Sequence, residues 1–406
     1  MGKKVRLAVA ILAFALVGAL SFAGSPSSFS ASKFVAQDPD PIVSGAFYQP
    51  LKSVTGEYVV FRCGADRELC EVHSELGGYT ETVIGMGPLG SEPTLSLDWQ
   101  KATKSNVPYQ YVFWESAGPK YDLMEAYFNG KWHGPINLGM GKLDSQPAAP
   151  QVWYESSASG NPNGEVVAWT NNRDQLYYAK SDNPSVKRSW KGPYTDRHIG
   201  NIGYSLSVID AGGGFDTAWW TGSGGHLYAA DFPTDPNGET WGPCDFGMGK
   251  LGSTPSVDWG PDLLPPGPPD EVTGNGAHDV PAAQKFADPG WKGNCPRKLY
   301  VTSKDWYGHA GEYTVCWGGD TSKGGLYCMA WALFSSQGEV AGPVKWGHMG
   351  VLGSAPSITR WPYVVDSAIS PMFWMSSTRA EDLMTAEFYP PTKPINLGFG
   401  PIGPGG

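Results

Sequence analysis

The sequence predicts an all-β protein built from about six repeats of one small sheet. Three observations predict this fold class: a glycine-rich phrase that returns about every fifty residues, a β-hairpin pattern in each unit, and the composition. Aromatic residues make up 13% of the 406-residue chain and charged residues only 17%. Aromatic and β-branched runs between Gly and Pro turns are typical of strands, and a period of this length indicates a repeat architecture.

The glycine-rich phrase reads Gly-x-Gly-x-Leu-Gly-Ser-x-Pro in its clearest copies. We expect its glycines to adopt positive φ where the chain crosses to the next sheet. We expect its Met, Ile or Phe and its Leu or Ile to fill the seam between neighbouring sheets. The central Leu or Ile residues are Leu89, Leu143, Ile202, Leu251, Leu352 and Ile402.

Each unit contains a hairpin whose first strand carries a Trp and whose second strand begins at a Leu. The Trp residues, which we expect in the core, are Trp114, Trp169, Trp220, Trp317 and Trp374, and unit one has Arg62 at this place. The returning strands begin at Leu69, Leu123, Leu176, Leu227, Leu326 and Leu383.

Two further strands complete each unit. A Trp-x-Gly-Pro element, such as Trp132–Pro135, precedes the glycine phrase, and a short strand such as Thr94–Trp99 follows it. Four strands per unit, repeated around an axis, form the blade of a β-propeller. A ring of blades buries the two apolar faces that a lone sheet exposes. The sequence therefore predicts a single propeller of about six four-stranded blades.

The blade count depends on one long interval. The gap from Leu251 to Leu352 is twice the usual one, so seven blades are possible. We favour a Pro/Gly-rich insertion in the fifth repeat, at about 260–311, because no second glycine phrase occurs there. Pro265-Pro266-Gly267 is typical of a loop. The propeller then spans residues 41–406.

The N-terminus has the pattern of a secretory signal peptide at 1–23. Lys3, Lys4 and Arg6 precede an apolar run, and small residues stand at Ser21 and Ala23. We expect cleavage there, a flexible leader over 24–40, and a secreted, extracellular protein without a membrane span. The six cysteines agree with export. Six cysteines allow fifteen pairings, of which we favour Cys63 with Cys70, Cys316 with Cys328, and Cys244 with Cys295.

The sequence carries no convincing catalytic, metal or cofactor motif. No CxxC, GxSxG or P-loop pattern occurs, and no pair of carboxylates repeats. We therefore favour a protein without enzyme activity and without a cofactor, and the alternative is a polysaccharide hydrolase or lyase, because propellers of this size also host such enzymes. The net charge of −10 argues against a nucleic-acid partner.

Trp residues at the ends of the strands after the glycine phrase are the candidate binding residues. Their simplest role is packing. Alternatively, their rings line one face of the propeller, where a Trp can stack on a sugar and neighbouring polar groups can bind its hydroxyls. The sugar-binding candidates are Trp99, Trp153, Trp259, Trp361, Asp98 and Asp258.

The Trp-x-Gly-Pro element, the glycine phrase and the Phe-Trp hairpin together resemble the bacterial PLL-type β-propeller lectins. The resemblance covers roughly Pro41 to the C-terminus. It implies a secreted lectin that binds fucose and related sugars in pockets between blades, using Trp residues, with glycans or cell-surface polysaccharides as partners.

The alternative function is a structural subunit of an extracellular fibril or biofilm matrix. In that hypothesis the leader at 24–40 pairs with an exposed blade edge of another copy, so that subunits associate head to tail. The competing expectation is a closed ring, in which the last glycine phrase meets the first strand of the same chain.

Overall fold

The computed structural model describes most of the repeats. The described residues are 43–48, 56–75, 78–103, 107–150, 152–153, 165–171, 175–196, 206–212, 215–233, 240–248, 250–259, 298–300, 313–319, 325–332, 339–346, 351–358, 371–377, 382–387 and 393–399, with positions 199, 202, 238 and 349. The predicted signal peptide and leader lie outside these residues, as does most of the insertion. Among the described residues, no helix is long and apolar enough to cross a membrane.

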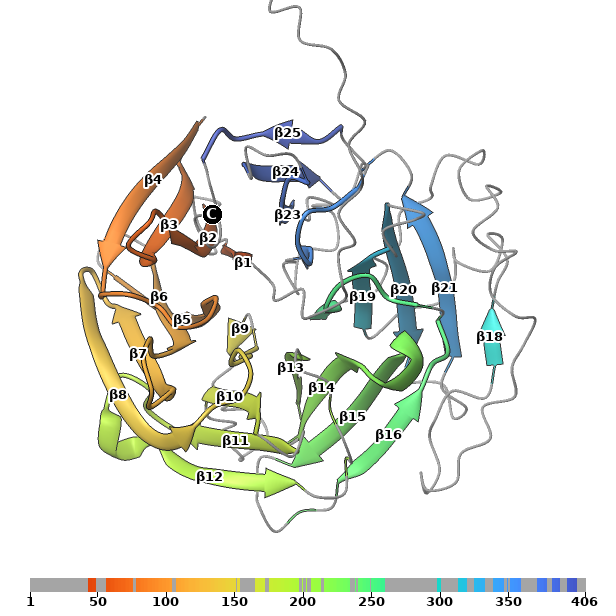
Figure 1. Cartoon of the computed structure of the whole chain (residues 1–406), viewed down its shortest axis with the longest axis horizontal. Coiled ribbons are helices and arrows are strands. Elements are labelled where there is room, and N and C mark those ends of the chain that lie inside the picture. The colour runs from red at the N-terminus through yellow and green to blue at the C-terminus, as the bar shows by residue number, and fades with distance from the viewer. Residues whose placement is uncertain are drawn as a thin grey trace, which may run out of the picture. The chain divides into compact units, whose positions relative to one another are not determined.

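The strands of the described residues form six sheets arranged around a ring (Figure 1). Blade 1 contains β1 (Val43–Tyr48), β2 (Gly56–Cys63), β3 (Glu68–Glu75) and β4 (Gly78–Gly85). Blade 2 contains β5 (Thr94–Ala102), β6 (Pro108–Glu115), β7 (Asp122–Phe128) and β8 (Trp132–Lys142). Blade 3 contains β10 (Glu165–Thr170), β11 (Leu176–Ser181) and β12 (Lys191–Asp196), with a short 3-10 helix at Lys187–Ser189.

The second half of the ring repeats this order. Blade 4 contains β13 (Leu206–Gly212), β14 (Phe215–Thr221), β15 (Leu227–Pro233) and β16 (Trp241–Asp245), with a second 3-10 turn at Ser223–Gly225. Blade 5 contains β17 (Ser256–Trp259), β19 (Tyr313–Gly318), β20 (Leu326–Ala332) and β21 (Glu339–Trp346). Blade 6 contains β22 (Ser357–Ile358), β23 (Pro371–Met375), β24 (Leu383–Glu387) and β25 (Ile395–Asn396). The prediction of a six-bladed, all-β propeller is confirmed.

Two short strands pair in parallel with a neighbour, unlike the antiparallel strands within the blades. β9 (Val152–Trp153) pairs with β5, the inner strand of blade 2. β18 (Lys298–Tyr300), which comes from the insertion, pairs with β21 and adds a fifth strand to the outer edge of blade 5. The insertion therefore contributes a strand to its own blade.

Six clusters of buried apolar side chains fill the seams, one between each pair of neighbouring blades. The Trp of each hairpin faces the preceding blade, as Trp169 does when it packs with Phe113 and Leu143. All five hairpin Trp residues are at most 2% exposed, as predicted for core residues. The sixth cluster joins Phe61 of blade 1 to Phe373 of blade 6 and closes the ring.

The strand register corrects which residue of unit one takes the place of the hairpin Trp. In blade 2, Trp114 lies opposite Met124, the residue after Leu123. In blade 1 the residue in that place is Phe61, which lies opposite Cys70. Phe61, not Arg62, is therefore the counterpart of the hairpin Trp, and Arg62 occupies the next position. The prediction was wrong by one residue because the hairpin turn of blade 1 differs in length from that of blade 2, which shifts the matching position.

The glycine phrase joins neighbouring blades by a recurring set of contacts, and its serine bond is present in four of the described seams. Its Met or Ile and its Leu or Ile pack in the seam, as Met248 and Leu251 do between blades 4 and 5. Gly85, Gly139 and Gly247 have positive φ, as predicted. The phrase Ser accepts a hydrogen bond from the end of the hairpin strand of the following blade. The four donor–acceptor pairs are Glu115 N to Ser91 Oγ at 3.0 Å, Thr170 N to Ser145 Oγ at 2.9 Å, Gly318 N to Ser253 Oγ at 2.8 Å, and Met375 N to Ser354 Oγ at 2.9 Å.

Substitution of this serine tests the role of the phrase. Ser253→Ala leaves the buried Gly318 N–H without its acceptor, so we expect it to lower the free energy of unfolding by about 1–3 kcal/mol. Urea denaturation measures the change. The matched control is Ser185→Ala, in a surface turn where the hydroxyl donates to the exposed Asn183. Equal stabilities of the two variants would show that the phrase does not join blades through this bond.

The Trp-x-Gly-Pro element creates a bulge in the outer strand. The registers of β7 with β8 and of β11 with β12 both shift next to this element. The Gly134–Pro135, Gly192–Pro193 and Gly242–Pro243 peptide bonds are cis. Gly134 has φ of 127°, and a Cβ there would lie 3.0 Å from the carbonyl oxygen of Glu125. The element therefore needs glycine for both conformation and space.

Two of the three predicted disulfides are confirmed. Cys63 bonds to Cys70 and Cys316 bonds to Cys328, each across the hairpin of its blade. Cys244 is also disulfide-bonded. Its predicted partner, Cys295, lies outside the described residues.

Candidate functional site

The candidate binding residues end the inner strands, on the rim opposite the glycine phrases. Trp99 lies near the end of β5, and Trp153 and Trp259 end β9 and β17. The side chains of these three residues and of Asp258 are not described, and Trp361 lies outside the described residues. Asp98 is fully buried. Their role in sugar binding stays a prediction.

The structure brings three of these residues together where blade 2 meets blade 3. The parallel pairing of β5 with β9 places Asp98 opposite Trp153, and Trp99 follows Asp98 in β5. Sequence reasoning grouped Asp98, Trp99 and Trp153 only by their repeat position. The pairing makes them neighbours in space, so this junction is the best-defined candidate site at the Trp-bearing rim.

Buried acidic and hydroxyl side chains lie beside this junction. Ser96 Oγ donates a hydrogen bond of 2.9 Å to Glu165 Oε2, which joins blade 2 to blade 3. Glu165 has no exposed surface, and its burial, with the nearby Asp98 carboxylate, raises its pKa well above the usual range. Burial and then the charges of Asp98 and Glu165 raise the pKa of Tyr111. Burial therefore favours the protonated form of both Glu165 and Tyr111 beside the junction.

A second polar arrangement repeats in two neighbouring seams. Trp190 directly precedes β12, the outer strand of blade 3. Its indole N–H donates a hydrogen bond of 3.2 Å to Oε2 of Glu125, which lies on β7 of blade 2. Glu71 of blade 1 likewise forms a side-chain hydrogen bond with Trp132 of blade 2. It also accepts a hydrogen bond of 3.2 Å from Gln110 Nε2. Burial raises the pKa of Glu125 to about 8 and raises the pKa of Glu71.

Sequence reasoning did not select Glu125, Glu165 or Glu71. Glu71 and Glu125 interrupt apolar hairpin strands, as the stretch Leu123-Met124-Glu125-Ala126 shows, and Glu165 begins one. That pattern could have marked them as buried polar groups, because a charged residue inside a buried strand requires a partner. Among the described residues, no group of His, Cys, Asp and Glu is placed to hold a metal ion.

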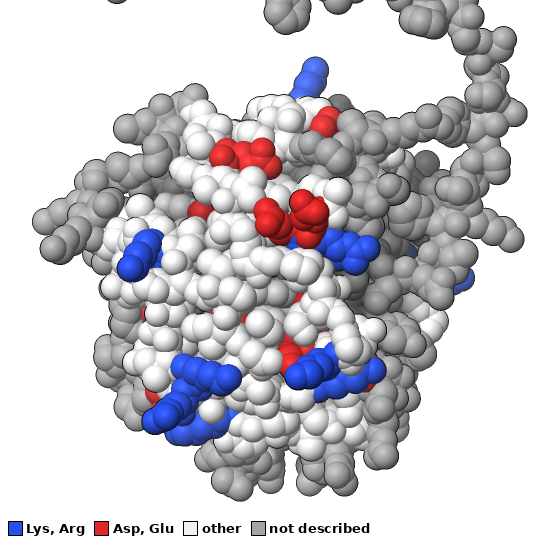
Figure 2. Space-filling model, turned by 60° about the vertical axis from the view of Figure 1, so that its left-hand side comes forward, with Lys and Arg blue, Asp and Glu red and all other residues white. Residues whose placement is uncertain are grey.

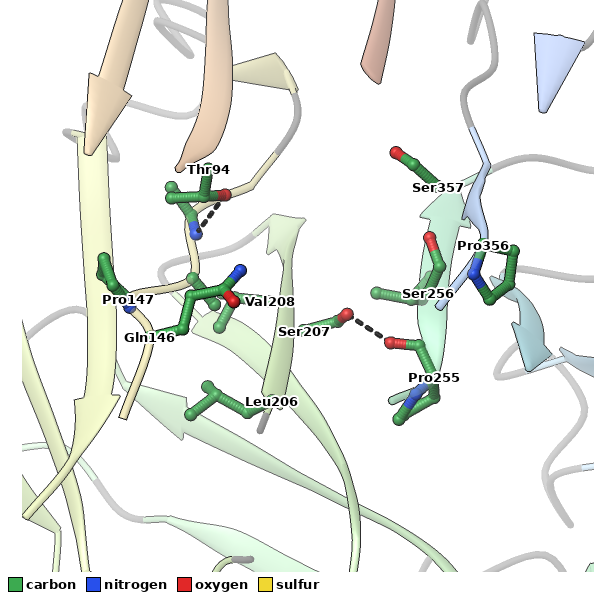
Figure 3. A pocket seen from close by; sticks show the side chains of 13 residues that line it. Thr94, Gln146, Pro147, Leu206, Ser207, Val208, Pro255, Ser256, Pro356 and Ser357 are labelled. Atoms are coloured by element: carbon green, nitrogen blue, oxygen red, sulfur yellow. Dashed lines mark hydrogen bonds between the residues drawn. The ribbon is translucent and has the colours of Figure 1, made fainter. Parts of the chain in front are cut away.

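The centre of the ring contains a small hollow of about 50 Å³ that is partly open to solvent (Figure 3). It is lined by the beginnings of the inner strands of blades 2 to 6. Hydroxyls of Thr94, Ser207, Ser256 and Ser357 and the amide of Gln146 lie around it, with Pro147, Pro255 and Pro356 between them. The hollow adjoins the glycine phrases and not the rim that carries the Trp residues.

Comparison with known proteins identifies the fold. No family model matches the chain, and no curated protein sequence matches it. The fucose-specific lectin from Aleuria aurantia superposes with a TM-score of 0.57 at 10% identity, covering 89% of this chain and 97% of the lectin. Another structure of the Aleuria aurantia lectin, described as a six-bladed β-propeller with a novel fucose recognition mode, gives a TM-score of 0.54 at 11% identity, with coverages of 89% and 97%. The fold is that of the six-bladed propeller lectins.

A third similar structure comes from a second organism. AofleA from Arthrobotrys oligospora has a TM-score of 0.54 at 12% identity, and the match covers 89% of this chain and 88% of AofleA. At these identities the likeness concerns the fold. The narrower resemblance to the PLL-type lectins stays a prediction.

Charged side chains lie in small groups of both signs on the outer face of the first blades (Figure 2). Broad uncharged areas separate these groups. Lys142 pairs with Asp144 at 3.2 Å and Lys191 with Asp182 at 3.6 Å, so part of the charge is compensated locally.

Proposed function

We propose that the protein is a secreted, lectin-like propeller that binds carbohydrates through its Trp-bearing rim and the seams beside it. The observation that carries this proposal is the junction of β5 and β9, where Asp98, Trp99 and Trp153 are neighbours. A Trp ring offers a flat apolar surface to the CH groups of a sugar.

The fold supports the same proposal. The similar solved structures are described as fucose-binding lectins, and this chain covers nearly their whole length. The Glu125–Trp190 and Glu71–Trp132 pairs place a carboxyl group and an indole together between blades. We propose that such seams contribute to recognition, with fucose and related neutral sugars as the first ligands to test.

The proposal predicts that single Trp substitutions weaken binding without unfolding the ring. Trp153→Ala and Trp259→Ala should each reduce sugar affinity about tenfold, which corresponds to about 1.4 kcal/mol. A glycan array with the mature protein identifies the ligand, and titration calorimetry then measures each variant. Tyr121→Ala, an aromatic truncation at an exposed turn near the opposite rim, is the matched control.

Two results would count against the proposal. The first is a correctly folded protein that binds no glycan on the array. The second is full sugar affinity in both Trp variants, which would show that the rim residues are wrongly chosen. Turnover of a polysaccharide by the purified protein would indicate an enzyme instead.

A further inference from the structure

The outer strand of blade 1 presents an open edge. β4 lies at the outer margin of the ring (Figure 1), and within the residues that the structure describes it pairs only with β3. The four consecutive residues Thr80–Val83 are all exposed, and Val83 is 60% exposed. Side chains that follow one another in a strand point to opposite faces. The exposure of all four therefore shows that solvent reaches both faces of β4 along its edge.

The other outer strands that the structure describes carry features that hinder the addition of a further strand. Each contains a proline or directly follows one, and proline lacks the N–H donor that an added strand needs. In blade 5, β18 already occupies part of the edge of β21, whereas β4 contains neither proline nor lysine. The prolines are Pro135 in β8, Pro193 in β12, Pro243 in β16, Pro343 in β21 and Pro394 before β25.

β4 is a regular strand that is held in place from both of its faces. Its register with β3 runs without a shift from Gly78 to Val83. The Tyr79 hydroxyl donates a hydrogen bond to Glu57 of β2, and Ile84 packs in the seam with blade 2. The outward N–H and C=O groups of β4 are therefore preorganised to pair with an extended chain.

The surface around β4 is acidic. Among the charged side chains that the structure describes in β2, β3, β4 and the turns between them, Arg67 is the one cation that reaches solvent, against four carboxyl groups. The carboxyl groups are those of Glu57, Asp66, Glu68 and Glu81. Pairing of β4 with the β4 strand of a second copy would bring two acidic edges together, so the charge favours a basic partner.

We propose that the outer edge of β4 binds an extended peptide segment rich in Lys or Arg, which adds a fifth strand to blade 1. Backbone hydrogen bonds supply the affinity in this mode of binding, and the surrounding carboxyl groups select a basic segment. The pairing of β18 with β21 shows that the outer edge of a blade in this ring accepts a fifth strand. The surface is separate from the Trp residues of the proposed function, which end inner strands.

A synthetic peptide tests the inference on the intact mature protein. The probe has the length of β4, eight residues, and alternates Lys with Val or Thr. Calorimetry should show saturable binding, and N-methylation of the backbone amides of the peptide should weaken it at least about tenfold, because the hydrogen-bond donors are lost. A peptide with Glu in place of each Lys should bind at least about tenfold more weakly because of charge repulsion.

Protein variants and hydrogen exchange locate the site. Glu81→Lys reverses the charge at the middle of the edge and should weaken peptide binding about tenfold. Asp182→Lys, the same reversal at a side chain that is 61% exposed in blade 3, is the matched control and should bind as the parent does. Bound peptide should slow amide exchange within Gly78–Gly85 and leave exchange within β8 and β12 unchanged.

Four results would overturn the inference. The Lys peptide fails to bind the folded protein, or its N-methylated or Glu form binds equally well. Glu81→Lys retains parental affinity. Peptide protection from exchange appears in another outer strand and not in β4. Light scattering shows a dimer of the protein that Glu81→Lys dissociates, which would assign the edge to a second copy instead.

Discussion

Replacement of Arg62 by Met is expected to lower the free energy of unfolding by about 3–5 kcal/mol. Arg62 forms an ion pair with Glu92, and the two side chains are only 11% and 1% exposed. Arg62 lies near the end of β2, and Glu92 belongs to the linker that enters blade 2, so the pair connects two blades. Its loss leaves a buried carboxylate without this cation, a larger cost than the loss of an exposed ion pair.

A double variant separates the cost of the orphaned charge from the value of the pair. Arg62→Met combined with Glu92→Gln removes both charges, so it should recover most of the stability lost in Arg62→Met. Urea denaturation at neutral pH measures the four proteins of the cycle. If Arg62→Met loses less than about 1 kcal/mol, or if the double variant recovers nothing, the ion pair does not stabilise the seam.

The folded protein is expected to become less stable as the pH rises from about 5 to 8, because several buried carboxyl groups hold their protons. Burial raises the pKa of Glu125 from 4.5 to about 8. Between these values the folded protein binds a proton that the unfolded chain has released. The stability that this proton provides is fully present below pH 4.5 and is lost as the pH rises to about 8, at about 1.4 kcal/mol per pH unit.

Other buried acids act in the same direction. Burial raises the pKa of Asp231 from 3.8 to about 6, although Thr217 donates to it at 2.6 Å. Glu165 and Glu71 also have raised pKa values, mainly because of burial. The combined effect opposes the usual acid denaturation of proteins, in which native carboxylates have lowered pKa values.

Glu125→Gln isolates the contribution of one seam. The amide resembles the protonated acid, so the side-chain oxygen of the variant can still accept a hydrogen bond from the Trp190 indole. We expect equal stability of variant and parent near pH 4.5, and a more stable variant at pH 8. Glu81→Gln on β4, where the side chain is exposed, is the control. An unchanged pH dependence in Glu125→Gln would show that Glu125 is ionised in the folded protein.

Much of the fold could be predicted because the repeats make each local signal appear several times. The six Leu residues that begin the returning strands are all buried, and they located the hairpins in every unit. The glycine phrase marked the blade boundaries. One repeat alone would not have placed Phe61, because the turns differ in length and the counterpart depends on the register with Cys70.

The candidate site was less predictable because its contacts cross between blades. Ser96 and Glu165 are 69 residues apart, and Glu125 and Trp190 are 65 apart. Which carboxyl group faces a seam depends on the register and on the neighbouring blade, and neither is visible in one unit. The central hollow combines residues from five blades, so no single motif could indicate it.

The continuity of each blade has a consequence for how such a protein evolves. Apart from the β9 pairing, every described sheet is made from one continuous stretch of the chain, and four of the described seams share the same serine junction. A duplication or deletion in the gene that runs between equivalent points of two glycine phrases would add or remove one complete blade. No sheet would be divided by it. Blade 5 illustrates the independence of the units, since it carries its own insertion, its own disulfide and an added edge strand within the same ring.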